Sequence, residues 1–128
     1  MTMSKMARIF GYTFLLLGIF GFIPGITYNG HLFGIFHVNW VHNFIHLLSG
    51  AVFLWAAYRS ECASMKCFQV FTFVYGLVTL LGLLFINRMM LGPMAINFAD
   101  TLLHAAITGV SLYMGYLASI RRTVYCGV

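Results

Sequence analysis

The sequence predicts an all-α fold, an integral membrane four-helix bundle, and three observations point to it. First, 62% of the 128 residues are hydrophobic and only 7% are charged, whereas a soluble domain of this length needs a polar shell. Second, the apolar residues fall into four stretches that approach the length of a membrane span. Third, the basic residues gather at the ends of these stretches. We expect one domain over residues 1–128, because no polar linker or soluble appendage interrupts the pattern.

Four candidate spans follow from the apolar stretches, since about 20 helical residues cross a hydrocarbon core. They cover residues 9–23, 39–58, 67–86 and 95–120. The first is short because Pro24 and Gly25 follow it, and a proline does not continue a helix easily. The segment 24–38 mixes aromatic residues with Asn, Gly and His. We expect it to be a loop that either lies in the membrane interface or dips back over the bundle.

The basic residues predict the orientation of the bundle. Only Arg88 lies in the connection between the third and fourth spans, on the side opposite to the other six basic residues. Such a bias predicts that both termini are cytoplasmic, and it accounts for the net charge of +5 without a nucleic acid partner. The six residues on the cytoplasmic side are Lys5, Arg8, Arg59, Lys66, Arg121 and Arg122.

The three cysteines are expected to lie at or near the cytoplasmic face under this orientation. They are Cys62, Cys67 and Cys126. Their spacing matches no metal knuckle and no redox pair, and cytoplasmic thiols stay reduced. We therefore expect all three to be free thiols.

An internal repeat relates the second and fourth spans. Each span opens with an Asn, followed three residues later by His or Asp and seven residues after the Asn by His. The positions are Asn39, His42 and His46 in the second span, and Asn97, Asp100 and His104 in the fourth. The first and third spans align loosely through Leu-Leu-Gly. Two helical hairpins in tandem keep the same membrane orientation, so the repeat predicts a pseudo-two-fold axis along the membrane normal.

A polar stripe follows from this spacing on each of the two helices. At about 100° per residue, the repeated polar positions share one third of the helix circumference. Lipid penalises such groups, so we expect the two stripes to face the bundle interior and each other, near the outer face. The seam is expected to contain Asn39, Asn43, Asn97 and Thr101 beside His42, His46, Asp100 and His104.

Three uses of this cluster compete. In the structural one, Asn39 and Asn97 cap helices and Asp100 pairs with a histidine to hold the helices together. In the second, the cluster binds a transition metal ion through His42, His46, Asp100 and His104, or a haem between His46 and His104. In the third, the histidines relay protons or line a path for a small solute. No hydrolase triad, phosphate loop or nucleotide motif is present, so no catalytic residue is assigned.

A second, weaker metal pattern lies in the two outer connections. Met89, Met90 and Met94 flank a Gly-Pro pair, and His31 and His37 lie in the first connection. Thioether and imidazole ligands together suit copper, but methionines are common in apolar loops. The partners that we expect are the lipid bilayer and either another membrane protein or a second copy of this chain.

Five motifs spread over most of the chain carry a family resemblance. They are Gly21-Phe22-Ile23-Pro24-Gly25, Leu32-Phe33-Gly34-Ile35-Phe36, Val38-Asn39, His42-Asn43-Phe-Ile-His46-Leu-Leu-Ser-Gly50, and Asn97 with Asp100 and Leu103-His104. The chain resembles in them an uncharacterised family of bacterial four-helix membrane proteins, the domain of unknown function DUF4383, although Thr101 stands where family members tend to have Asn. The resemblance implies a bacterial four-helix membrane protein and no particular activity, and we expect an inner-membrane location. A looser likeness to DoxX-type membrane proteins, some of them subunits of quinone-linked oxidoreductases, concerns architecture only.

Overall fold

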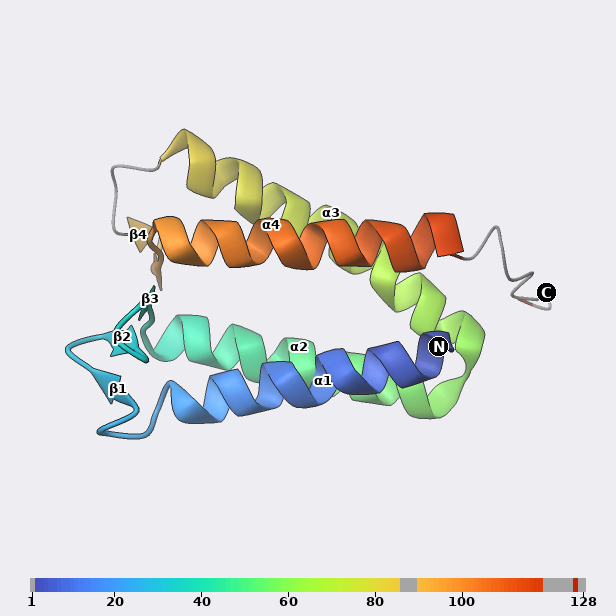
Figure 1. Ribbon diagram of the computed structural model, residues 1–128, viewed down its shortest axis with the longest axis horizontal. Coiled ribbons are helices and arrows are strands. Elements are labelled where there is room, and N and C mark those ends of the chain that lie inside the picture. Colours follow the sequence, from blue (N-terminus) through green and yellow to red (C-terminus); the bar gives the residue numbers. More distant parts are fainter. Residues whose placement is uncertain (1, 86–89, 119–125, 127–128) are drawn as a thin grey trace.

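Four long helices dominate the computed structural model, which describes residues 2–85, 90–118 and 126 (Figure 1). Helix α1 packs along α2, and α3 packs along α4 and its continuation (Figure 1). Short strands connect the helices at one end. The elements are α1 (Met3–Phe20), β1 (Thr27–Tyr28), β2 (His31–Leu32), β3 (Phe36–His37), α2 (Trp40–Arg59), α3 (Glu61–Leu84), β4 (Met90–Leu91), β5 (Met94–Ala95), α4 (Phe98–Leu112) and the π-helix η1 (Tyr113–Leu117).

The helix starts differ from the predicted spans because polar caps precede the apolar runs. Helix α1 begins at Met3, where the Thr2 hydroxyl accepts a hydrogen bond from the Lys5 N–H at 3.1 Å. Helix α3 begins at Glu61, where Ser60 accepts from the Ala63 N–H at 3.0 Å. Helix α4 begins later than predicted, because residues 94 and 95 form a strand. Residues 86, 119 and 120, at the ends of the predicted third and fourth spans, lie outside the described residues.

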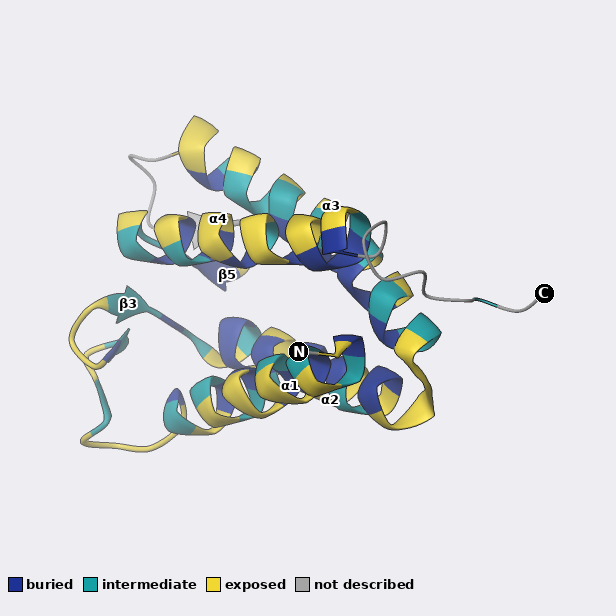
Figure 2. Ribbon diagram, turned by 45° about the vertical axis from the view of Figure 1, so that its right-hand side comes forward, coloured by how far each residue is buried: buried dark blue, intermediate teal, exposed yellow. Residues whose placement is uncertain are grey.

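Three of the described helices are long and apolar enough to cross a membrane, namely α1, α2 and α3 with 18, 20 and 24 residues. Helix α4 has 15 residues and runs directly into the five residues of η1. Large apolar side chains such as Leu16, Leu48, Leu77 and Leu102 lie exposed on the outer faces of the helices (Figure 2). Lipid tails suit such a surface, whereas water would penalise it.

The segment 24–38 forms a small antiparallel sheet in the order β1-β2-β3, where the sequence predicted a loop. Tyr28 pairs with His31 across Asn29 and Gly30, which both have positive φ (49° and 74°). Asn-Gly is the sequence signal for a two-residue hairpin of this kind. Residues 90–95 form a separate hairpin, β4-β5, which turns at Gly92, whose φ is 59°. The three-stranded sheet and the β4-β5 hairpin lie at the same end of the bundle (Figure 1).

An aromatic core fills the middle of the bundle. Phe14 of α1 stacks on Phe53 of α2 with ring centroids 5.9 Å apart. Phe53 contacts Phe71 of α3 at 4.4 Å, and Phe71 stacks on Tyr75 at 5.6 Å. These rings join the two helix pairs, and the Tyr75 ring, 5.5 Å from that of His104, places this core next to the histidines.

The end opposite the hairpins ties the two termini to the start of α3. Glu61 accepts hydrogen bonds from the Met3 N–H at 2.7 Å and the Ser4 N–H at 3.3 Å. Cys62 and Cys126 form a disulfide, so the prediction of three free thiols was wrong for these two. Cys67 is free and buried, as expected. The pair escaped the sequence analysis because the two cysteines are 64 residues apart and only folding brings them together.

Candidate metal centre

The first turn of α2 fixes one imidazole of the cluster. Asn39 caps the helix by accepting from the His42 N–H at 3.0 Å, and its amide donates to the Pro93 carbonyl at 2.8 Å. The His42 Nδ1 lies 2.7 Å from the Ala95 carbonyl oxygen and 3.1 Å from that of His37. Because both neighbours are acceptors, Nδ1 carries the proton and donates it. The lone pair of His42 is therefore on Nε2, the tautomer in which a metal-binding imidazole is usually held.

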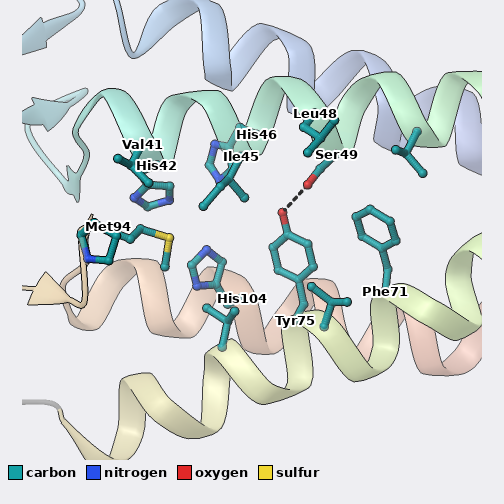
Figure 3. Close-up of a pocket in the computed structure, with 14 residues that line it drawn as sticks. Val41, His42, Ile45, His46, Leu48, Ser49, Phe71, Tyr75, Met94 and His104 are labelled. Atoms are coloured by element: carbon teal, nitrogen blue, oxygen red, sulfur yellow. Dashed lines mark hydrogen bonds between the residues drawn. The ribbon is translucent and has the colours of Figure 1, made fainter.

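The other two imidazoles lie beside His42 in the space between α2 and α4 (Figure 3). The ligand nitrogens of His42, His46 and His104 all lie within 4.8 Å of one another, and all three side chains are buried. His42 Nε2, both ring nitrogens of His46 and His104 Nδ1 have no hydrogen-bond partner among the described residues. A buried polar atom without a partner costs about 1–3 kcal/mol. The cluster is thus a concentration of unsatisfied nitrogen atoms.

A mostly apolar cavity of about 430 Å³ adjoins the three histidines. Leu48 of α2 and Val74 of α3 line it and are exposed on the outer surface of the bundle, so its mouth faces sideways between these helices. At its inner end the Ser49 and Tyr75 hydroxyls bond to each other at 3.0 Å (Figure 3). Met94 of β5 covers the end nearest the hairpins. The histidine nitrogens therefore lie in a site with little other polarity.

Asp100 has a role that the sequence did not predict. Its Oδ2 accepts from the Asn97 N–H at 2.8 Å and from the His37 N–H at 3.0 Å. The Asn97 side chain accepts from the Asp100 N–H at 2.9 Å and donates to the Ile35 carbonyl at 2.7 Å. Asp100 thus completes a capping box and attaches β3 of the three-stranded sheet to α4. Within the described part of the chain, the group with metal-ligand geometry contains the three histidines without Asp100.

The remaining polar positions of the two stripes divide between neighbouring helices. Asn39 and Asn97 reach across to the opposite hairpin, as given above. Asn43 packs against Gly21, where an added Cβ would collide with the Asn43 side chain. Thr101 packs against Gly82 of α3 and donates to the Asn97 carbonyl at 3.0 Å. Asn43 and Thr101 therefore turn toward the helix pair to which each belongs and not toward each other.

The ring positions accommodate a single ion but leave no room for a haem. The centroids of His46 and His104 are 6.5 Å apart, and His42 lies 4.6 Å and 5.7 Å from them. In a haem held by two imidazoles, the macrocycle fills the space around the line that joins the rings. His42 lies beside that line, where the macrocycle would pass.

Sequence reasoning missed Met94 as a neighbour of these histidines, and it grouped Met94 with Met89 and Met90 near His31 and His37 instead. The side chain of Met94 is buried and lines the same cavity as the three histidines. Met89 lies outside the described residues. His31 and His37 stack on each other with centroids 5.1 Å apart. No periodicity could have placed Met94, because it lies in a strand that folds back over α2.

The fold and the site together define a class of protein: an apolar helical bundle with a buried histidine cluster beside a three-stranded sheet and a β-hairpin. The chain belongs to a family described as Domain of unknown function (DUF4383), whose profile matches residues 5–117. The resemblance found in the sequence motifs is confirmed. No curated protein and no solved structure shows significant similarity to the chain.

Proposed function

We propose that this chain is a bacterial inner-membrane protein that binds one transition metal ion through His42, His46 and His104, near the outer face of the membrane. The observation that carries the proposal is the approach of three ligand nitrogens to within 4.8 Å of one another, combined with the absence of hydrogen-bond partners for four ring nitrogens of the cluster among the described residues. An ion would accept one lone pair from each of the three rings, and the second nitrogen of His46 would keep its proton.

The structural alternative, a partner subunit whose cluster serves only helix packing, accounts less well for the histidines. Three other residues of the cluster do hold segments together, because their side chains form hydrogen bonds with the backbone of a connecting segment. These residues are Asn39, Asn97 and Asp100. The His46 ring makes no such bond with the described residues through either nitrogen. A packing network that leaves several buried nitrogens unsatisfied is worse than an apolar contact. Metal binding explains the proximity and three of the four missing partners.

The donor set narrows the class of ion. Imidazole binds zinc, copper, nickel and iron, whereas calcium and magnesium require oxygen ligands. Three protein ligands with an open position are also the usual form of a catalytic zinc site. The Zn–N distance is about 2.1 Å, so the nitrogens around a tetrahedral ion are about 3.4 Å apart. The three rings would therefore close slightly upon binding.

The membrane arrangement that we propose has four spans and both termini in the cytoplasm. Helix α4 supplies the fourth span by continuing through η1. The basic residues support the orientation, although Arg88, Arg121 and Arg122 lie outside the described residues. The three-stranded sheet, the β4-β5 hairpin and the histidines then lie on the periplasmic side.

We further propose that the two helix pairs are tandem repeats related by a pseudo-two-fold axis along the membrane normal. Hydrogen bonds between the two repeats support this, because equivalent positions make equivalent bonds in both directions. Residues 39 and 97 are equivalent in the repeat, as are 35 and 93, 42 and 100, and 37 and 95. The turns at Gly34 and Gly92, both with positive φ, also correspond. The paired contacts are Asn39 to Pro93 and Asn97 to Ile35, then His42 to Ala95 and Asp100 to His37.

Metal loading of the detergent-purified protein tests the proposed function. Chelator-stripped protein is incubated with Zn²⁺, Co²⁺ or Cu(I), desalted and analysed for bound metal. The intact chain should retain about one ion, and His46→Leu should retain almost none. His31→Leu is the matched control, since His31 lies outside the cluster, and it should bind like the parent. Equal retention by all three proteins, or by none, would overturn the proposal.

A further inference from the structure

Met94 is held over the histidine cluster by bonds on both sides of it. The carbonyl of Pro93 accepts from the Asn39 side chain at 2.8 Å, and that of Ala95 accepts from the His42 Nδ1 at 2.7 Å. The backbone of β5 is therefore attached to the first turn of α2 immediately before and after Met94. The Met94 side chain is 7% exposed, and its sulfur projects into the space between His42 and His104 (Figure 3).

We propose that the Met94 Sδ is the fourth ligand of this centre and that the resulting site selects Cu(I). The inference rests on the proposed function, because it presupposes that the three histidines bind an ion. It adds the chemical class of that ion and a ligand from β5. Three imidazoles and one thioether form a neutral set of four donors, and thioether sulfur is a soft ligand that favours Cu(I).

The electrostatics of the site favour a monovalent ion. No carboxylate belongs to the group of ligand atoms in the described residues, and the Asp100 Oδ2 already accepts from two backbone N–H groups. The cost of transferring an ion into a medium of low dielectric constant scales with the square of its charge, so Cu(I) costs about a quarter as much as a divalent ion. Anionic ligands would offset the extra transfer cost of a divalent ion by neutralising its charge, but the neutral ligands of this site do not.

A packing role for Met94 predicts different behaviour from a ligand role. Leucine has nearly the volume of methionine, and such exchanges in a core cost less than about 1.5 kcal/mol. Met94→Leu should therefore fold and keep the three histidines in place. If Met94 only fills space, the affinity for Cu(I) will not change. If its sulfur binds the ion, the affinity for Cu(I) will fall while that for Zn²⁺ changes little.

The test measures Cu(I) affinity without oxygen, by competition with a chromophoric Cu(I) chelator, alongside Zn²⁺ affinity. The proteins are the full chain, Met94→Leu and the control Met114→Leu, since Met114 is equally buried but lies in η1. We expect Met94→Leu to lose at least about tenfold in Cu(I) affinity and less than about threefold in Zn²⁺ affinity. Met114→Leu should match the parent in both.

X-ray absorption at the copper edge of the unmodified protein provides a second measurement that needs no variant. It should detect a sulfur atom bound to copper together with nitrogen ligands. A copper environment of nitrogen alone, or equal Cu(I) affinity in Met94→Leu and the parent, would overturn this inference and leave the three-histidine centre standing. Tighter binding of Zn²⁺ than of Cu(I) by the parent would also overturn it. Failure of the parent to bind any of these ions would instead refute the proposed function.

Discussion

Both acidic side chains of this protein accept backbone N–H groups at helix starts. The chain has only two Asp or Glu residues. Glu61 accepts from the first residues of α1, and Asp100 accepts from Asn97 and His37. The positive end of a helix dipole and its free N–H groups stabilise a carboxylate there. In an apolar bundle, these negative charges are therefore paired with backbone donors.

Asp100→Asn tests whether the carboxylate is a cap or a metal ligand. Asparagine keeps one oxygen acceptor for the N–H groups of Asn97 and His37, so we expect a loss of about 1 kcal/mol in the free energy of unfolding. The affinity for metal should change by less than about threefold. By contrast, loss of a group that holds a metal ligand in place typically lowers metal affinity by about tenfold or more. Chemical denaturation and metal titration of the purified variant measure the two effects. Loss of the metal with unchanged stability would make Asp100 a ligand after all.

Two histidine substitutions should have opposite effects on the stability of the metal-free protein. His46→Leu removes two nitrogens that have no partner among the described residues, and it keeps an apolar contact with Phe14, so the melting temperature should hold or rise. His42→Leu removes the donor to the Ala95 and His37 carbonyls, and it should lower the free energy of unfolding by about 1–3 kcal/mol. Thermal melts in detergent compare the two. A large destabilisation by His46→Leu would indicate a hydrogen-bonded structural role.

At the scale of the elements, glycines set how closely α1 and α2 approach. A Cβ added at Gly50 would lie 2.8 Å from the Gly11 carbonyl oxygen and 2.9 Å from the Leu15 backbone nitrogen. These are backbone atoms, so they cannot turn aside as a side chain could. Small residues at helix contacts are the usual basis of close packing in membranes.

Gly50→Ala should therefore separate α1 from α2 and destabilise the bundle by about 1–3 kcal/mol, the usual cost of overpacking. Gly109→Ala is the matched control, because among the described residues no atom beyond its own stretch of helix backbone lies within 4 Å of its added Cβ, and alanine is the better helix former. Its stability should be unchanged or slightly higher. Unfolding in mixed detergents measures both, and equal stability of the two variants would contradict the packing described here.

The helices and the histidine triad could be predicted from sequence because both follow from periodicity. Apolar runs indicate spans wherever they occur, and His42 and His46 at a spacing of four residues must share a helix face. The repeat then placed His104 beside them. The role of Asp100 could not be predicted, because it depends on the His37 N–H of a hairpin. The position of Met94 and the Cys62–Cys126 disulfide likewise depend on contacts between distant segments.

At the scale of the whole molecule, the orientation in the membrane decides the state of the cysteine pair. Cys62 and Cys126 lie at the end of the bundle that we assign to the cytoplasm, where thiols are kept reduced. If the proposed orientation is right, a membrane-permeant maleimide will trap both as thiols in intact cells, even though the folded chain brings them to bonding distance. A pair that is already oxidised in growing cells would place this end in the periplasm and reverse the proposed orientation.

The metal content of protein purified from its own membrane, without added metal, tests the central claim most directly. The account holds that His42, His46 and His104 bind an ion in the native protein. Elemental analysis should then find about one transition metal ion per chain in the parent and almost none in His46→Leu prepared in parallel. A parent protein without metal, or a His46→Leu protein with as much metal as the parent, would contradict it.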